Sequence, residues 1–576
     1  MVYKDLERPV MLKSLGFVCR GNLDDGYLRS NMKDSFKIAI LLLGLALFPF
    51  LPVSAETLAT IDAEIQNGNT TLTRIAGQAA YNVYSDVTGN PNSFLDRKIA
   101  ILQAAGITNF ASSGNYSNFY SFTGQAGVTD TKIDIITTTS TTRLYRRGNS
   151  SRLETQSYLG SWWSGSYLGT AATRNGQAVL AAWGSDLQRI YVIDVPAGTT
   201  LVGGLAAPME QAGEYRSGGA YQYYYRGVPA SWLVYALYAP DYLQSYAAAV
   251  SGAQRLGENG LEDLGTHIDE VRYRVLQNRG IDANGLRQEE TQTKTNKGKD
   301  NNTTGKLMNP WLRIYGGDSR LNNSGEDMER NFNGIHLGWE KLVRGEGDNE
   351  KDYWHIGGLI GQSFMKQNSR SNVKNDITHN YAGIYSVFQS RPDQLCSWYN
   401  SAGILYGHMQ FANQVPGELG YGLNQTYSGN MLATSVEHGL TFRRSNGWYI
   451  EPQIQMVYTK VLQDTFTDKL GANVRVRRGD SLAGRLGVAI VRQSKTKAGR
   501  ETKFWVKANY LRELRGQNKV DVAGDEAFHD KSDSVFQLKV GTHFVSSQKF
   551  VFSGEISKDF GQEHGYQGSL SLQSFF

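Results

Sequence analysis

The stretch SLSLQSFF at residues 569–576 ends the chain. Within it, Leu570 and Leu572 fall on one face of an extended backbone, and Ser571 and Gln573 fall on the other. Alternation with a period of two predicts a β-strand that is apolar on one side and polar on the other. An amphipathic last strand that ends in an aromatic residue is typical of a bacterial outer-membrane β-barrel, although an edge strand of a soluble sheet also fits this pattern.

The composition points in the same direction. The 576 residues include 63 Gly, 32 Tyr and 23 Phe but only 2 Cys, and outer-membrane barrels are rich in glycine and in girdles of aromatic side chains. The length suggests more than one domain. The net charge of +5 is small and no basic stripe is present, which argues against a nucleic-acid partner.

The N-terminal region has the features of a secretory signal. Lys33 and Lys37 precede an uninterrupted apolar run at 38–53, and the small residues at 53–55 provide a cleavage site. A basic segment, an apolar segment and a small-residue site in this order predict export through a Sec-type signal peptide. We place the core of this signal at 32–55.

The residues upstream of this signal leave one alternative open. The signal region covers 1–55 as a whole, and translation could begin at Met1 or at Met32. Cys19 lies before the expected cleavage site, so the mature chain would keep only Cys396. We therefore expect neither an intramolecular disulfide nor a metal site built from several cysteines.

From Asn309 to the end, segments with period-two alternation recur between polar stretches, which predicts a transmembrane β-barrel. We expect polar stretches at 317–332, 365–379 and 462–480 to be external loops. The predicted strands are about twelve in number and antiparallel, at 309–316, 333–343, 353–364, 380–389, 396–411, 430–443, 447–461, 481–492, 503–513, 534–545, 548–558 and 566–576.

Four motifs carry a family resemblance: NPWLRIYGG (309–317), KFWVKANYLRE (503–513), FSGEISKDFG (552–561) and YQGSLSLQSFF (566–576). Together they make 309–576 resemble the translocator barrel of autotransporters, the type V secretion proteins. The resemblance implies a pore in the outer membrane that delivers an N-terminal passenger to the cell surface or beyond. The partners it implies are outer-membrane lipid, periplasmic chaperones and the barrel assembly machinery.

A region at 256–308 separates the two expected domains. Its first part has the apolar spacing of an amphipathic helix, and a polar stretch follows at 278–308. Members of the family thread a helix through the pore just before the first strand. Either the polar stretch fills the lumen here, or the helix belongs to the end of the passenger. The apolar positions of the helix are Leu261, Leu264, Ile268, Val271 and Val275.

Residues 56–255 are expected to form a globular α+β passenger. No internal repeat is visible, and about 200 residues are enough for one compact domain. Helical patterns occur at 58–65 and 96–105. Segments rich in Ile, Val, Thr and Tyr predict strands at 132–138, 142–146, 189–195 and 221–225.

One series of motifs suggests chemistry in the passenger. RLYRRGN (143–149) and IYVIDVPAGTTLV (190–202) precede a GG-x-x-Q sequence at 218–222. This order resembles the ADP-ribosyltransferase and NAD-glycohydrolase toxin domains, for which NAD would be the substrate. Arg143 or Arg146 would then hold the NAD diphosphate, which suits a guanidinium because it binds phosphate oxygens bidentately.

The same resemblance implies roles for other residues. Tyr167 would contact the nicotinamide, and Gln222 would position the scissile bond or the attacking water. Transferases of this group use a glutamate, for which Glu214 is the candidate, with Glu210 nearby. Neither glutamate stands in an E-x-E or Q-x-E pair. No spacing of metal ligands is present, so no metal is expected.

The alternative is a passenger without enzymatic activity. Trp162, Trp163 and the tyrosines at 221–225 would serve an adhesive surface as readily as a nucleotide pocket. An adhesin or another surface-binding domain would recognise a host or bacterial surface instead of NAD. The sequence leaves these two classes of passenger open.

Overall fold

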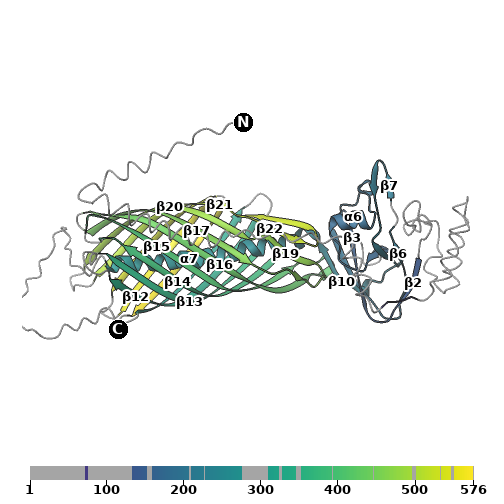
Figure 1. Cartoon of the computed structure of the whole chain (residues 1–576), viewed down its shortest axis with the longest axis horizontal. Helices are drawn as coiled ribbons and strands as arrows, with labels where there is room; N and C mark the ends of the chain where they lie inside the picture. Colours follow the sequence, from purple (N-terminus) through teal and green to yellow (C-terminus); the bar gives the residue numbers. More distant parts are fainter. Residues whose placement is uncertain are drawn as a thin grey trace, which may run out of the picture.

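A computed structural model gives the fold of the chain (Figure 1). The expected signal region, the helices expected at 58–65 and 96–105, the stretch at 276–308 and the two C-terminal phenylalanines lie outside the residues that the structure describes. The described residues are 72–74, 133–151, 159–206, 209–225, 227–275, 309–322, 327–344, 352–391, 394–444, 447–495, 501–531, 534–545 and 550–574.

The C-terminal half forms a closed antiparallel barrel of twelve strands, which confirms the predicted fold class and strand number. Each strand contains most of one predicted segment. In order around the barrel they are β11 (Asn309–Asn322), β12 (Asp327–Arg344), β13 (Tyr353–Ser369), β14 (Lys374–Gln389), β15 (Cys396–Val415), β16 (Leu423–Arg443), β17 (Trp448–Leu462), β20 (Asp480–Lys495), β21 (Glu501–Arg515), β24 (Ser534–Val545), β25 (Phe550–Gly561) and β26 (Glu563–Ser574).

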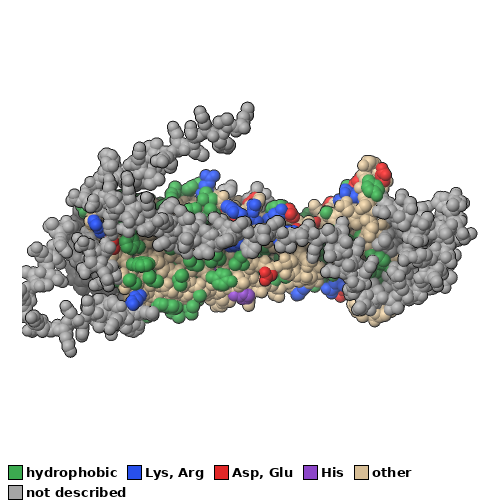
Figure 2. Space-filling view, in the orientation of Figure 1, with side chains coloured by type: hydrophobic (Ala, Val, Ile, Leu, Met, Phe, Trp, Pro, Cys, Tyr) green, Lys and Arg blue, Asp and Glu red, His purple; other side chains and the backbone are tan. Residues whose placement is uncertain are grey.

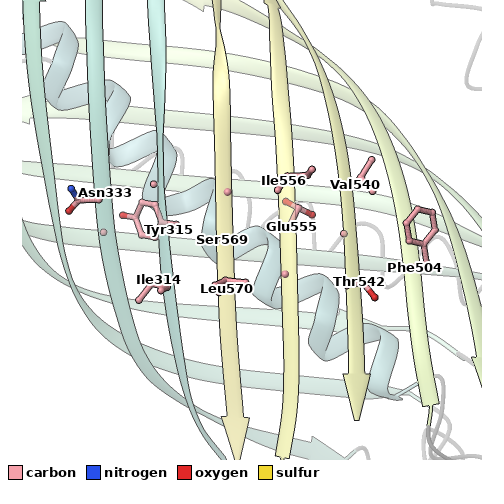
Figure 3. Close-up of a pocket in the computed structure, with 15 residues that line it drawn as sticks. Ile314, Tyr315, Asn333, Phe504, Val540, Thr542, Glu555, Ile556, Ser569 and Leu570 are labelled. Carbon is pink, nitrogen blue, oxygen red and sulfur yellow. The ribbon is translucent and has the colours of Figure 1, made fainter. Parts of the chain in front are cut away.

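The last strand closes the barrel against the first. The register of β26 and β11 begins at Trp311 opposite Gln573 and places Gly316 opposite Gly568. Figure 3 shows this seam, with α7 behind the strands. Gly316, Gly554 and Gly568 leave a shallow apolar depression of about 790 Å³ in the wall. Closure leaves the barrel without a free sheet edge, as a membrane-spanning sheet requires.

The two faces of the strands differ as the alternation predicted. On β26, Tyr566 and Leu570 point outward with exposed fractions of 57% and 62%, whereas Ser571 and Gln573 are buried toward the lumen. Exposed large apolar side chains continue on the other strands, and Figure 2 shows them gathered on one part of the barrel wall. We call these outward apolar side chains the apolar band. A hydrocarbon environment outside and a polar lumen inside account for this division.

Two predicted loops are wrong. The stretches 317–332 and 365–379 lie mostly in strands, because β11 continues to Asn322 and β13 to Ser369. These strands are longer than the 9–11 residues that span a bilayer, so their outer parts extend beyond it. There both faces can be polar, since water replaces lipid on the outside, and the polar composition that suggested loops is compatible with strands.

The third predicted loop, 462–480, is also partly wrong, because it contains two short strands. They join two strands from the link between β21 and β24 in a four-stranded sheet, which extends the barrel wall at the same end. The sheet consists of β18 (Phe466–Thr467), β19 (Asn473–Arg478), β22 (Gln517–Val522) and β23 (Asp525–Asp530).

The N-terminal domain is built on an eight-stranded sheet in the order β1-β2-β6-β9-β4-β3-β5-β10. All four predicted strands are present. The sheet strands are β1 (Leu72–Arg74), β2 (Ile133–Thr138), β3 (Thr142–Gly148), β4 (Trp162–Ser164), β5 (Arg189–Val195), β6 (Thr200–Leu205), β9 (Tyr221–Tyr224) and β10 (Leu233–Tyr238). Outside the sheet are the helix α6 (Thr170–Gly176), the single turns η3 (Ala181–Trp183) and η4 (Ala230–Trp232), and a hairpin of β7 (Met209–Gln211) and β8 (Glu214–Arg216).

The helix predicted from the apolar spacing at 261–275 is present, but it begins much earlier. It is α7 (Ala239–Val275), a helix of 37 residues that starts directly after β10. Its first half is rich in alanine, so the apolar spacing that marks the second half is less evident there. Among the described residues, no helix is long and apolar enough to cross a membrane.

One cysteine differs from expectation. Cys396, at the start of β15, is disulfide-bonded in the structure, whereas no intramolecular disulfide was expected. The chain has only one other cysteine, Cys19, which lies outside the described residues. The expectation concerned the mature chain, from which Cys19 would be removed with the signal peptide, and for that chain it stays a prediction.

The apolar band makes a prediction about assembly. Replacing Leu570 by Arg places a charge on the lipid-facing wall, which costs about 2–4 kcal/mol near the bilayer midplane. We expect the variant to unfold at a lower temperature when heated in detergent and followed by gel mobility. Asn331→Arg is the control, because Asn331 is exposed on the long outer part of β12. Equal unfolding temperatures for the two variants would contradict the assignment of this face to lipid.

Candidate functional site

The lumen of the barrel is occupied by α7, which runs from the N-terminal domain toward the opposite end (Figure 1). At a rise of about 1.5 Å per residue, its 37 residues give a length of about 55 Å. Two glycines allow the helix to lie against the wall. A Cβ atom at Gly252 would lie 2.7 Å from Ile377 Cδ1, and one at Gly257 would lie 2.5 Å from Met431 Cε.

The first acidic pair on α7 binds an arginine of the wall. Asp263 and Glu270 are seven residues apart, so they lie two turns apart on one face of the helix. Between them Arg313, which β11 directs into the lumen, bonds Asp263 at 3.0 Å and Glu270 at 2.8 Å. All three side chains are buried. One guanidinium therefore holds two helical turns against the first barrel strand.

The second acidic pair faces strands β21 and β24, on a different part of the wall. Glu262 and Asp269 are also seven residues apart. Lys539 on β24 lies 2.6 Å from Glu262, and Lys507 on β21 lies 2.7 Å from Asp269. Glu555 on β25 lies between the two lysines, 3.1 Å from Lys539 and 3.7 Å from Lys507. The two acidic pairs thus meet basic groups on different strands of the wall.

Basic residues of α7 meet acidic residues of the wall in the same way. Arg255 lies 3.2 Å from both Asp559 on β25 and Glu563 on β26. Near the other end of the helix, Arg272 bonds Glu451 on β17 at 2.9 Å. Charges of each sign on the helix are therefore matched by charges of the opposite sign on the wall.

These pairs determine what the lumen can do. A cavity that remains between α7 and the wall on the side of Glu262 and Lys539 has a volume of about 60 Å³. Removing one partner of a buried ion pair leaves an uncompensated charge, which typically costs 3–5 kcal/mol. The arrangement can therefore hold the helix in place and keep the lumen closed.

At the mouth where α7 begins, a loop of the barrel wall binds the helix. The Asp468 carboxylate accepts hydrogen bonds from the hydroxyl groups of Tyr242 and Tyr246, the latter at 2.9 Å. Backbone amides of Leu470 and Ala472 donate to its other oxygen. Burial raises the pKa of Asp468, and these hydrogen bonds oppose the rise.

The N-terminal domain docks on the same mouth through a buried ion pair. Arg147 on β3 pairs with Asp525, at the start of β23, and also donates to the Tyr167 hydroxyl at 2.7 Å. The backbone amide of Thr170 donates to Asp525 at 2.7 Å. Burial raises the pKa of Tyr167 well above its ordinary value, so its hydroxyl stays protonated.

A second contact joins β10 to the link between β15 and β16. The backbone amide of Ala236 donates to the Tyr421 carbonyl oxygen at 3.0 Å. Arg189 on β5 forms an ion pair with Glu418 in the same link. The domain therefore rests on at least two separate parts of the mouth.

The residues predicted to bind NAD are placed as follows. Arg143 forms a salt bridge with Asp194, with Nε 2.8 Å from Oδ1, and Arg146 donates to the Leu159 carbonyl oxygen at 2.9 Å. The two arginines are three residues apart, and side chains alternate along a strand, so they lie on opposite faces of β3. Arg146 and Tyr167 line one cavity, but its volume of about 10 Å³ has room for about one water molecule.

The two predicted catalytic residues are not brought together. Gln222 is buried on β9, opposite Ser164 of β4. Glu214 lies on the hairpin of β7 and β8, outside the main sheet. Arg216 donates a hydrogen bond of 2.8 Å to the Glu214 carboxylate, and this bond lowers the pKa of Glu214. Neither residue lines the cavity shared by Arg146 and Tyr167. The five predicted residues therefore do not surround one cavity in the described domain.

Comparison with known proteins identifies the barrel. Residues 310–557 match the family model of the autotransporter β-domain. The C-terminal half contains an autotransporter β-domain.

Curated relatives agree with this assignment. The chain is 25% identical to the pertactin autotransporter of Bordetella bronchiseptica over 215 residues, which are 37% of this chain and 23% of the relative. It is 27% identical to the probable autotransporter YfaL of Escherichia coli over 267 residues, 44% of this chain and 20% of the relative. The chain thus spans under a quarter of the length of these relatives.

Two of the solved structures that the chain matches are autotransporter translocators. The β-domain of the Bordetella autotransporter BrkA is matched with a TM-score of 0.38 at 14% identity, over 47% of this chain and 99% of that chain. The transport unit of AIDA-I from Escherichia coli is matched with a TM-score of 0.39 at 18% identity, over 46% of this chain and 90% of that chain.

Sequence reasoning did not identify the residues that hold the autotransporter β-domain and its helix together. The signal was present as two acidic pairs with a spacing of seven, Glu262 with Asp269 and Asp263 with Glu270. The helical spacing predicted an amphipathic helix but assigned these carboxylates no partner. Arg147 was also missed, although it stands next to Arg146 and makes the contact with Tyr167.

The pairing of Arg313 gives a direct prediction. Arg313→Leu leaves Asp263 and Glu270 buried without their partner, so we expect about 3–5 kcal/mol of destabilisation and a lower unfolding temperature in detergent. Arg320→Leu is the matched control. Arg320 lies on the same strand with its side chain 53% exposed and pairs with Glu329, and exposed pairs contribute about 0–1 kcal/mol. Equal losses in both variants would contradict a helix held by lumen charges.

Proposed function

We propose that this chain is an autotransporter whose β-domain inserts in the outer membrane and holds the N-terminal domain outside the cell. The path of α7 carries the proposal. The helix leaves the N-terminal domain at one mouth, passes through the lumen, and ends near the other mouth, where β11 begins and β26 ends. A chain that follows this path has its N-terminal domain and the beginning of its first barrel strand on opposite sides of the membrane.

The orientation follows from the two ends of the barrel. In autotransporters the passenger is delivered to the outside, so the mouth that contacts the N-terminal domain is the external one. Val275 and Asn309 both lie toward the opposite mouth, and the polar stretch between them is then anchored at the periplasmic side. A protease added to whole cells should accordingly not cut the chain next to Val275 or Asn309.

We infer further that the N-terminal domain stays attached at the surface. The buried pair of Arg147 with Asp525 and the hydrogen bonds of Asp468 with α7 fix the domain and its helix to the external mouth. A passenger destined for release gains little from a buried contact with its own pore. The domain therefore acts as a cap on the barrel as well as the displayed part.

For the activity of this domain we favour binding to a surface. Trp183 and Tyr215 are large side chains with exposed fractions of 49% and 58%. Their two segments are joined by a hydrogen bond of 2.7 Å, which the Ala181 backbone amide donates to the Glu214 carboxylate. Figure 1 shows the hairpin of β7 and β8 projecting from the domain. Exposed aromatic side chains on a projecting hairpin suit contact with another surface, since Trp and Tyr dominate binding hot spots. NAD hydrolysis or transfer, with Gln222 and Glu214 as catalytic residues, stays a prediction.

Topology can be tested with two single cysteines in a Cys396→Ser background. Ser217, in the N-terminal domain, and Ser494, at the opposite end of β20, are both exposed. We expect a membrane-impermeant maleimide to label Ser217→Cys on intact cells, and to label Ser494→Cys only after the outer membrane is permeabilised. Labelling with the reverse pattern would overturn the proposed orientation.

Docking of the cap can be tested at neighbouring acidic residues. Asp525→Ala removes the partner of Arg147, which typically costs 3–5 kcal/mol for a buried pair. We expect faster amide hydrogen exchange in β3 and around Thr170. Glu526→Ala is the control, because Glu526 forms a more exposed pair with Lys519 at 2.7 Å. Unchanged exchange in Asp525→Ala would contradict a docked cap.

The two passenger classes can be separated by two assays on the whole protein. Surface binding predicts that Trp183→Ala and Tyr215→Ala each weaken attachment of displaying cells to a target surface by about tenfold or more, as for hot-spot residues. Gln222→Ala, which changes a buried residue, should leave attachment unchanged if the domain still folds. Release of nicotinamide from NAD that falls in Gln222→Ala would instead support the enzymatic prediction.

A further inference from the structure

On the wall formed by β17, β20 and β21, basic side chains begin next to the apolar band. Ile454, Leu486 and Tyr510 lie side by side in the register of these strands, and all three are exposed. One step further toward the external mouth, the corresponding side chain on β21 is Arg512, which is also exposed. The boundary between lipid and water on this side is therefore followed at once by basic residues.

Several cations gather just beyond this boundary, and we call them the basic rim. They come from the ends of neighbouring strands and from the sheet that extends the wall. Arg478 is opposite Lys519 in the register of β19 and β22, and Lys460 is opposite Asp480 in that of β17 and β20. Figure 2 shows blue side chains gathered in this region. The members are Lys460, Arg477, Arg478, Arg512, Arg515 and Lys519.

The basic rim carries more positive charge than its neighbours neutralise. Carboxylates pair with several of its members, since Arg477 lies 3.3 Å from Asp521, Arg515 lies 3.0 Å from Asp480, and Lys519 pairs with Glu526. Arg478 and Arg512 are exposed and have no ion-pair partner in the part of the chain that the structure describes. These two guanidinium groups are available to bind an external anion.

An apolar side chain lies among the cations. Leu514, between Arg512 and Arg515 in the sequence, is 58% exposed, and a Cβ atom at Gly484 would lie 3.6 Å from it. Exposure of leucine next to arginine is unfavourable in water but suits a molecule that has both an anionic head and apolar chains. Arginine is also the side chain that best matches phosphate, because its fork of donors binds two oxygens at once.

We propose that the basic rim binds the phosphate groups of a lipid in the leaflet next to the external mouth, with the acyl chains of the lipid against Leu486, Tyr510 and Leu514. Arg478 and Arg512 contact phosphate directly, and the remaining cations attract it over a longer range. The assignment of the leaflet rests on the proposed orientation, whereas binding itself does not.

The external ends of β11 and β12 do not share this surplus of positive charge. At the external ends of β11 and β12, Arg320 pairs with Glu329, and Asp318 and Asp327 are also exposed. That part of the wall is neutral or acidic, so it gives no reason to bind a phosphorylated lipid. Arg320 therefore provides a matched control for the arginines of the basic rim.

The test uses the whole purified protein in a non-ionic detergent. Lipid A, a glycolipid with two phosphates, is titrated, and bound lipid is measured by native mass spectrometry. We expect saturable binding that weakens at least tenfold in the Arg478→Gln, Arg512→Gln double variant and does not change in Arg320→Gln. Gel mobility before and after heating verifies that each variant is folded.

Two further binding measurements identify which part of the ligand is recognised. Lipid A without its phosphates should bind at least tenfold more weakly, and inorganic phosphate at the same concentration should not displace the phosphorylated lipid. Equal binding by the double variant or by the dephosphorylated lipid would overturn the proposal, and displacement by inorganic phosphate would show a free-anion site instead. Because the assay is made in detergent, these results do not depend on the cysteine-labelling test of orientation.

Discussion

Charge pairing between α7 and the lumen is the interaction on which the rest of the structure depends. A barrel lumen that contains Arg313, Lys507 and Lys539 carries buried positive charge that only nearby carboxylates can compensate. The helix supplies these carboxylates as two pairs spaced by seven residues, while its own Arg255 and Arg272 meet acidic residues of the wall. Helix and barrel therefore specify each other, because either one alone would expose or bury unpaired charge.

This constraint also fixes where the N-terminal domain lies. The pairs set the position of α7 along the lumen, and the helix begins directly after the last strand of the N-terminal sheet. The domain is thus brought to one mouth, where Asp468 and Asp525 bind the helix and β3. In the proposed orientation, the same geometry that closes the pore holds the docked domain outside the cell.

The barrel could be predicted from the sequence because its physical cause is local and repeated. Lipid on one face and a polar lumen on the other impose alternation, and each strand, such as β26, shows it independently. The same reasoning failed beyond the membrane. At 317–332 and 365–379 both strand faces can be polar, so the pattern no longer separates strands from loops.

The contacts of the site were harder to predict because they join residues far apart in the sequence. Asp263 meets Arg313 only when the helix lies in the lumen, and helical spacing alone could not choose between lumen and passenger. The passenger motifs show the opposite problem. Arg143 and Arg146 fit a family order in sequence, yet β3 directs them to opposite faces of the sheet. A linear motif therefore predicts a site only when the strand geometry brings its members together.

Ion conductance of the purified protein in a planar lipid bilayer tests the central claim most directly. The whole chain should conduct little, because the helix occupies the lumen. The Asp263→Ala, Asp269→Ala double variant should show frequent, larger openings, since Arg313 would keep only Glu270 on the helix and Lys507 would lose its partner there. A whole chain that conducts steadily as an open pore, with the same current in the double variant, would contradict a lumen closed by charge pairing with α7.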